Sequence, residues 1–424
     1  MKRICSLILA LCPFLLAAQP VGYREYMQAV ASDNATLLAE KYNVDIAAAN
    51  LQAARVFNDP ELSLAFSDNQ ERTLMMGRSF EAGLSYGFSL GGVRQARIGV
   101  AATEQELSEA ALADFFRQLR EEATVAWADA WAARERERIS RSTSETLSRV
   151  ASADSLRAAV GEIRRSDAAQ SALEAVTQKG EWMQARADYR NALSALSLLA
   201  GGLPVGDLPE QDLPAADVHY SLSELMDVAE RSRADLKAAE LSHTLSQKNL
   251  ALVRASRAME LGLELGYSYN TEVRNEIAPA PAFNGVTVGV TIPLKFSSLN
   301  RGERAAAEAS VAQAERYLQA ARQQVRSEVL QAWNAYEAAR EVAEHYATDI
   351  VSGARSILEG MEYAYSRGDV SLLELLTAVR TYNDVALSAV EAQGPGWPPP
   401  HTCVLPWGSS RYFPSKYLSL PRHA

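Results

Sequence analysis

The side chains that most often carry out chemistry are widely separated in this chain. The five histidines are His219, His243, His345, His401 and His423. No two of them are close enough in sequence to form a short metal-binding motif. Cys5 and Cys12 fall in an apolar N-terminal run, which leaves only Cys403 beyond it. The sequence therefore predicts no metal site, no cofactor and no internal disulfide.

Motifs for phosphate binding and nucleophilic catalysis are also missing. Gly91 and Gly92 follow a strand-like run but lack the lysine and hydroxyl of a phosphate-binding loop. We find no candidate nucleophile in a sharp strand-to-helix turn. The net charge is −10, with both signs interspersed and no basic block that could follow a phosphate backbone. An enzyme and a nucleic-acid-binding protein are therefore disfavoured.

Two short segments do gather charge, and each surrounds a glycine. The nine residues concerned are Gly161, Glu162, Arg164, Arg165, Asp167, Arg367, Gly368, Asp369 and Glu374. If copies of these segments met around a pore, their charges would form rings that select ions and hold neighbours together. The alternative is that they are solvated loop charges, whose exposed pairs contribute about 0–1 kcal/mol each. We interpret the set as a candidate gate.

Long helices must position these segments. Proline is absent between Pro60 and Pro204 and again between Pro293 and Pro395, and helix-favouring residues fill 94–199 and 299–392. A helix of about sixty residues would be about 90 Å long, so it must pack in a coiled coil or a tube wall. Each tract has one glycine turn, at 159–167 and at 366–374, and Ser166 or Ser371 can cap the helix that follows. The tracts therefore predict two helical hairpins.

Four runs alternate apolar with small or polar residues, as strands do. They span 61–68, 82–90, 260–270 and 286–293. Their length and alternation match transmembrane strands, whereas a single such run would more often be an ordinary amphipathic strand. The residues expected to face lipid are Leu84, Tyr86, Phe88, Leu261, Leu263, Leu265, Val288 and Val290. Four strands cannot close a barrel, so each chain would supply part of a shared one.

The N-terminus predicts export. Lys2 and Arg3 precede an apolar run that ends in Ala17-Ala18-Gln19, the pattern of a secretory signal peptide cleaved after Ala18. Beyond it, no stretch has the eighteen apolar residues of a membrane helix. An exported chain of this kind is periplasmic, secreted or a β-barrel.

An internal repeat connects the helices to the strands. Asn50-Leu51, Arg55 and Glu61-Leu62 recur 199 positions later, and Ala133-Arg134-Glu135 recurs 206 positions later. The repeat predicts a signal peptide at 1–18, a first repeat at 19–199, a linker at 200–220 and a second repeat at 221–393. The first repeat would hold a strand pair at 61–90 and the second a strand pair at 260–294. Residues 394–424 are rich in proline and aromatic residues, and our hypothesis is an aberrant tail, possibly frameshifted.

The order of these features resembles the TolC-type outer-membrane efflux channels over nearly the whole mature chain. The resemblance rests on Asn58-Asp-Pro-Glu-Leu entering the first strand, on Gly91-Gly92-Val-Arg and Asn300-Arg-Gly-Glu-Arg after the strand pairs, and on the two glycine turns. The first strand pair also looks like the heavy-metal efflux branch. That branch often has Asn-Pro-Glu-Leu and Gly-Gly-Lys-Arg, whereas this chain inserts Asp59 and has Val93 in place of the lysine.

The resemblance implies a mainly α fold with a small β part, in which three protomers share a twelve-stranded barrel and a periplasmic helical tunnel. It also implies an outer-membrane location, a periplasmic adaptor and an inner-membrane pump as partners, and export of small molecules or metal cations. Two alternatives stay open. A periplasmic coiled-coil adaptor would carry a lipoyl-like β domain, and a secreted enzyme would need a polar cluster.

Overall fold

The computed structural model describes residues 21–68, 72–209, 221–257, 260–293, 301–345 and 349–393. The expected signal peptide, the tail from 394 and the part of the linker that follows Pro209 lie outside these ranges. The chain divides into two compact units, each assembled from separate stretches of sequence. One contains residues 1–39, 113–234 and 324–424, and the other contains 40–112 and 235–323. We describe each unit by itself.

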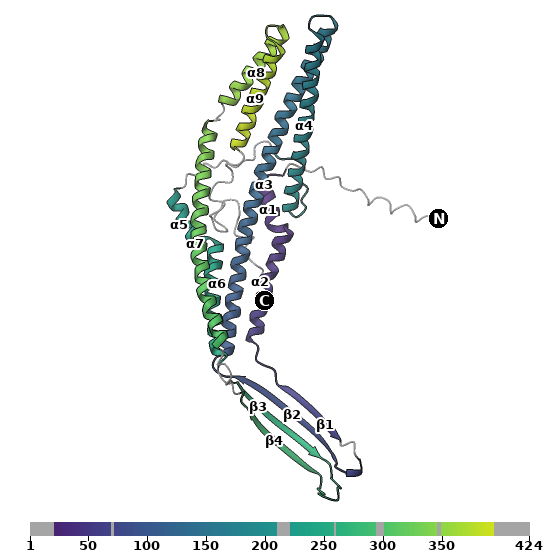
Figure 1. The fold of residues 1–424 in the computed structure, drawn as a ribbon, viewed down its shortest axis with the longest axis vertical. Helices are drawn as coiled ribbons and strands as arrows, with labels where there is room; N and C mark the ends of the chain where they lie inside the picture. Colours follow the sequence, from purple (N-terminus) through teal and green to yellow (C-terminus); the bar gives the residue numbers. More distant parts are fainter. Residues whose placement is uncertain are drawn as a thin grey trace, which may run out of the picture. The chain divides into compact units, whose positions relative to one another are not determined.

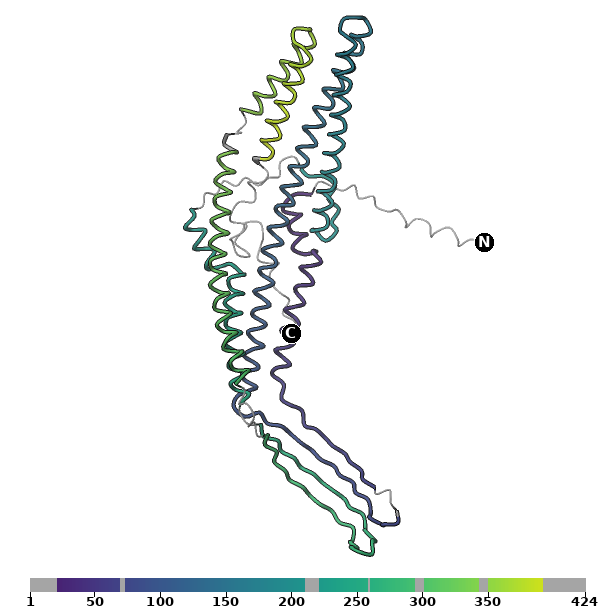
Figure 2. The backbone as a smooth tube through the Cα atoms, in the orientation of Figure 1, coloured from purple at the N-terminus to yellow at the C-terminus, as the bar shows by residue number. Residues whose placement is uncertain are grey.

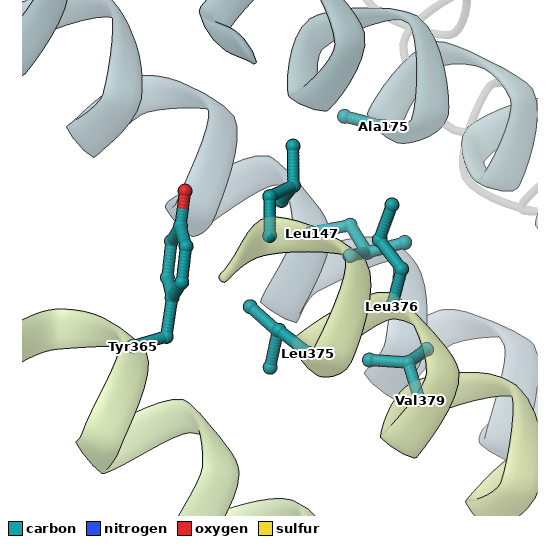
Figure 3. Close-up of a cluster of buried hydrophobic side chains, with 7 residues drawn as sticks. Leu147, Ala175, Tyr365, Leu375, Leu376 and Val379 are labelled. Atoms are coloured by element: carbon teal, nitrogen blue, oxygen red, sulfur yellow. The ribbon is translucent and has the colours of Figure 1, made fainter. Parts of the chain in front are cut away.

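The first unit is helical, and two hairpins dominate it (Figure 1). Its helices are α1 (Tyr23–Asp33), most of α3 (Val93–Ala159), α4 (Arg165–Leu199), α5 (Leu222–Ser232), the second part of α7 (Arg301–His345), α8 (Asp349–Arg367) and α9 (Leu372–Gln393). Helices α3 and α4 form one hairpin, and α8 and α9 form the other. Between the hairpins, buried residues of all four helices make a core (Figure 3), which contains Leu147, Ala175, Tyr365, Leu372, Leu375, Leu376 and Val379.

The second unit combines a sheet with helices. It contains most of α2 (Ala35–Arg55), the start of α3, α6 (Ala234–Ala255), the start of α7 and strands β1 (Glu61–Asp68), β2 (Arg78–Ser89), β3 (Glu260–Asn270) and β4 (Phe283–Thr291). A short 3-10 helix, η1 (Arg72–Leu74), lies between β1 and β2. Figure 2 shows the chain running from α2 through β1 and β2 into α3. The strands pair antiparallel in the order β1-β2-β3-β4.

The register places all eight apolar residues expected to face lipid on one face of the sheet. Directly paired residues share a face, and the pairs join Leu84 with Leu265 and Val288, Tyr86 with Leu263 and Val290, and Phe88 with Leu261. On this face Leu64, Val286 and Val288 are each more than 70% exposed, which shows that no described residue covers them. The opposite face is small and polar, with Gly83 opposite Gly266 and Gly87 opposite Gly262. A continuous apolar face is thus left open to whatever surrounds the sheet.

The predicted fold class, mainly α with a small four-stranded part, is confirmed, with two differences in the bounds of the strands. Strand β2 begins at Arg78, four residues earlier than expected, because Asp68 pairs with Arg78 at the end of the ladder. Strand β4 covers 283–291 rather than 286–293, because its first residues pair with Tyr269 and Asn270. In the second helical tract the described helices are α7, α8 and α9, and residues 346–348 lie outside the described part of the chain.

Candidate functional site

The two predicted glycine turns exist and have the same construction. Gly161 and Gly368 have φ values of 80° and 81°, a left-handed conformation that glycine adopts without strain. In the first turn the amide of Glu162 donates to the carbonyl of Arg157 at 2.8 Å. In the second, the amide of Asp369 donates to the carbonyl of Ala364 at 3.0 Å. Both bonds span five residues, which is the glycine-terminated helix end known as the Schellman motif.

The helices that follow the turns begin differently. Ser371 forms a capping box with Glu374, whose Oε2 accepts from the Ser371 amide at 2.7 Å while the Glu374 amide donates to Ser371 Oγ at 3.3 Å. Ser371 therefore caps α9 as expected. The same expectation for Ser166 is wrong, because α4 begins at Arg165 and Ser166 lies inside its first turn, where its hydroxyl donates to Asp167 at 3.1 Å.

The charged residues of the turns pair locally. Arg157 lies 3.4 Å from Glu162 in the first turn, and Arg367 lies 3.7 Å from Asp369 in the second. Arg164 and Arg165 are exposed. The capping bonds from the Ser371 amide and hydroxyl hold the pKa of the Glu374 carboxyl below its usual value. Each turn thus organises its own charges, and among the described contacts the links between the two hairpins are made by other residues.

The most deeply buried of the links joins Asp154 of α3 to Tyr365 of α8. Three further contacts between the hairpins are Thr143 with Asn383, Arg136 with Glu391, and Glu174 with Arg380. The Tyr365 hydroxyl lies 2.9 Å from Oδ1 and 2.8 Å from Oδ2 of Asp154, and Asp154 is 0% exposed. Arg157 lies 3.9 Å from the same carboxylate and places its guanidinium 5.7 Å from the centre of the Tyr365 ring. Burial, followed by the hydrogen bond to Asp154, raises the pKa of the Tyr365 hydroxyl. The tyrosine therefore stays protonated and donates to a buried carboxylate.

Figure 3 shows Tyr365 beside Leu147 and Leu375, so the polar link lies next to the apolar core of the hairpins. One turn before it on α8 is Glu362. Burial raises the pKa of the Glu362 carboxyl; the positive charge of Arg149 opposes this shift and the negative charge of Glu359 adds to it. A hydrogen bond with Thr146 also favours the charged form. The surroundings of Glu362 therefore disfavour the charged form of its carboxyl group overall.

Sequence reasoning selected the turns but missed Asp154 and Tyr365. Asp154 sits in the middle of a helical pattern rich in charge, where a solvated face is the default interpretation. One signal was available in the sequence. Tyr365 lies one helical turn before Gly368, and Asp154 lies two helical turns before Gly161, so each is near the tip of its hairpin. Sequence pattern alone cannot show that the side chains face each other.

The described residues show no group of three or more His, Cys, Asp or Glu side chains placed to hold a metal ion. Among those same residues, no helix is both long enough and apolar enough to cross a membrane. The expectation that the sequence lacks Gly-x-Ser-x-Gly spacing is wrong, because residues 83–87 have it. They lie within β2, however, so Ser85 is not at the strand-to-helix turn that exposes a nucleophile.

Comparisons with known proteins agree with this architecture. Residues 225–395 match the family described as outer membrane efflux protein. The chain is 26% identical over 366 residues to the cobalt-zinc-cadmium resistance protein CzcC of Cupriavidus metallidurans, covering 86% of this chain and 84% of the relative. It also resembles the crystal structure of CusC, with a TM-score of 0.72, 17% identity and coverage of 90% of this chain and 91% of that one.

A second similar structure is the open state of the Neisseria gonorrhoeae MtrE outer membrane channel. Its TM-score is 0.71 at 18% identity, and the match covers 90% of this chain and 87% of MtrE. At these identities the two structures support the fold.

Proposed function

We propose that this chain is an outer-membrane efflux channel of the family that residues 225–395 match, and that three copies assemble around one pore. The observation that carries the proposal is the open four-stranded sheet, whose outer strands β1 and β4 have no further partner among the described strands. An open sheet edge cannot face lipid. Twelve strands from three copies would leave no edge and would close a barrel.

The two faces of the sheet suit that assembly. The apolar face with its eight predicted residues would contact lipid, and the small polar face would line the lumen. On the polar face, a side chain added at Gly83 would meet Ser63 Oγ at 2.6 Å, and one added at Gly285 would meet Ser268 Oγ at 2.6 Å. Glycines therefore give room to polar neighbours across the strand, which keeps the wall thin and the lumen hydrophilic.

The hairpins would form the periplasmic tunnel, with their glycine turns at its inner end. A periplasmic adaptor and an inner-membrane pump are the proposed partners at these tips. The buried Asp154–Tyr365 link is placed to hold the two hairpins of one protomer together in the closed channel. The charges around Gly161 and Gly368 would then line the entrance as the candidate gate, together with this link.

Divalent metal cations are the proposed cargo. The support is the relative named for cobalt, zinc and cadmium resistance, which matches most of this chain. A passage whose wall binds its cargo weakly needs no resident metal site. Small organic molecules are the competing cargo, and a cell lacking this gene would distinguish the two by losing tolerance to zinc, cadmium and cobalt or to antibiotics instead.

The test of the assembly uses outer-membrane fractions. We expect a band that migrates as a trimer without heating and as a monomer after heating, and a conducting pore when the purified protein is added to planar bilayers. Recovery of monomers in the soluble periplasmic fraction would contradict the channel. The periplasmic adaptor alternative finds no support among the described strands, because they form one antiparallel sheet continuous with the long helices.

A further inference from the structure

A short segment after α4 contacts both helices of the first hairpin, and the proposed gate gives this segment no role. We call residues 203–209 the base strap. Helix α4 ends at Leu199, and Gly201 follows with φ 67° so close to α1 that an added Cβ would lie 2.2 Å from the carbonyl oxygen of Asp33. Asn34 donates to the Leu199 carbonyl at 2.9 Å and caps α2 by accepting from the Leu37 amide at 2.9 Å. The strap therefore starts from a fixed point.

One residue of the strap, Leu208, is bonded through its backbone to both helices of the hairpin. The amide of Leu208 donates to the hydroxyl of Tyr189 on α4 at 3.2 Å. The carbonyl of Leu208 accepts from Arg134 on α3 at 2.7 Å, and Arg134 also donates to the Pro209 carbonyl at 2.7 Å. The Leu208 side chain is only 4% exposed. Leu208 thus bridges α3 and α4.

Side-chain hydrogen bonds also hold Leu208 in place. The Tyr189 hydroxyl donates to Asp207, and Asp207 Oδ1 also accepts from the Leu208 amide at 2.8 Å. Burial and the bond to Asp207 raise the pKa of the Tyr189 hydroxyl, so it remains a donor. The Arg134 side chain is 14% exposed and lies 3.1 Å from Glu135. A buried, charge-assisted contact of this kind is stronger than an exposed pair.

The bridge lies at matching heights on the two helices. Arg134 is 26 residues before Val160 and Tyr189 is 25 residues after Arg164, so each is about 38 Å from the turn at 1.5 Å per residue. Between the bridge and the turn, Trp182 of α4 donates to Glu137 of α3 at 2.7 Å. The strap adds a further connection between α3 and α4 far from the turn, so the two helices are held together along most of the hairpin.

We infer that Arg134, Tyr189 and the strap are positioning residues that make the first hairpin a rigid lever, so that a change at its base is transmitted to the tip. This inference rests on the proposed channel. With the bridge in place, movement of the hairpin displaces Gly161 and its neighbours as one body. Without it, α3 and α4 keep the Trp182–Glu137 bond but are held less firmly, and the distribution of tip positions broadens even when the Asp154–Tyr365 link is intact.

Spin-label distance measurements on the full-length protein in detergent or nanodiscs test this inference. Cys403→Ser removes the cysteine that remains in the exported chain. Labels at Leu156 on α3 and Leu173 on α4, 72% and 68% exposed, report the separation of the two helices within one protomer. A single label at Val160, which is 80% exposed, reports the distances between tips in the assembly. A label at Ile277, 92% exposed in the segment between β3 and β4, serves as the distant reference.

We expect Arg134→Ala and Tyr189→Phe to broaden both the Leu156–Leu173 and the Val160 distributions well below the unfolding temperature, leaving Ile277 unchanged. The splayed population should rise about tenfold, which corresponds to about 1.4 kcal/mol. Arg141→Ala is the matched control, because Arg141 is an exposed arginine two turns further along α3 that pairs with Glu145 on the same helix. Tyr189→Phe keeps the buried ring, so it remains informative if Arg134→Ala folds poorly.

Unchanged distributions in both strap variants would overturn the inference, as would equal broadening at Ile277, which would indicate general destabilisation. The Leu156–Leu173 pair separates this failure from failure of the trimer. If Val160 labels give no distance between copies in the parent protein, the assembly is wrong and the lever has no tip to position. If they do give one, only the strap is in question.

Discussion

The hydroxyl of Tyr365 reaches both carboxylate oxygens of Asp154, at 2.9 and 2.8 Å, in a contact where Asp154 is completely buried. A buried carboxylate is costly unless its hydrogen bonds are made. The two residues belong to different hairpins, so separating the hairpins would break the bond, whereas their packed arrangement satisfies Asp154. This makes the pair a candidate determinant of the closed state.

Replacing this tyrosine should therefore open the channel. Tyr365→Phe keeps the ring in the apolar core but removes the donor, and a hydrogen bond to a charged group contributes about 1.5–3 kcal/mol. We expect open probability in planar bilayers to rise about 10- to 100-fold. Tyr317→Phe is the control, because Tyr317 is 65% exposed and lies on α7, outside both hairpins. Equal conductance of the Tyr365 variant and the parent would show that the link does not hold the gate.

Glu362 predicts a pH dependence of the hairpin contact. Burial raises its pKa above the usual 4.5, so this group favours the packed state most fully below pH 4.5 and less as pH rises through the raised pKa. Glu362→Gln should stabilise the packed hairpins at pH 7, by less than about 1 kcal/mol because the site is partly solvated. The gain should vanish near pH 4.5.

Thermal unfolding followed by circular dichroism from pH 4 to 8 measures this effect. Glu181→Gln, an exposed substitution on α4, serves as the control. A Glu362→Gln protein that is destabilised at pH 7 would show that the charged carboxylate is favoured by Arg149 and Thr146 more than burial disfavours it.

The two carboxylates of the second turn differ in what their removal would do. Asp369 is exposed beside Arg367, whereas Glu374 completes the capping box of α9. Glutamine can replace glutamate in a capping box, so Asp369→Asn with Glu374→Gln removes charge and preserves the cap. We expect this double variant to raise single-channel conductance or antibiotic leakage, most clearly at low salt, where screening is weak. Identical conductance would exclude these two charges from the gate.

The glycine turns should be needed for coupling to the pump. Alanine at Gly161 or Gly368 would have to adopt φ near 80°, at a cost of about 1–2 kcal/mol. Space is not the obstacle, because an added Cβ at Gly161 would have no neighbour within 4 Å and one at Gly368 would lie 3.7 Å from Arg157. We expect alanine to impair efflux in cells at normal protein levels and asparagine, which tolerates this conformation, to impair it less. Equal effects of the two substitutions would indicate a role other than backbone geometry.

The elements of this fold could be predicted because their signals are local. Proline-free helical tracts, glycine turns and alternating strands each depend on neighbours in sequence, and the repeat located them twice. Strand ends were less certain, because whether Arg78 or Phe283 joins the ladder depends on the partner strand.

The candidate site was predictable only in part, for the same reason. Gly161 and Gly368 follow from the turn chemistry, but the contact of Asp154 with Tyr365 joins residues 211 positions apart. The bridge through Leu208 uses backbone groups, which carry no sequence signature at all. Contacts between helices distant in sequence therefore required the structure.

The orientation of the sheet gives the last prediction. Leu263 lies in a central row with Tyr86 and Val290 on the apolar face. If this face contacts lipid, Leu263→Arg places a charge in hydrocarbon and should cost about 2–4 kcal/mol near the membrane midplane. Folding titrations into lipid vesicles and the yield of heat-modifiable trimer in outer membranes would measure that loss.

The matched substitution lies on the opposite face of the same sheet. Gly262→Arg would test it, but an added Cβ there meets the Thr291 Cβ at 3.3 Å, so crowding would confuse the result. Gly87, the residue opposite Gly262, has no atom within 4 Å of an added Cβ. Gly87→Arg should therefore be accommodated in an aqueous lumen and assemble nearly as well as the parent. Assembly of Leu263→Arg together with failure of Gly87→Arg would reverse the two faces, because each arginine reports the solvent that its side of the sheet contacts.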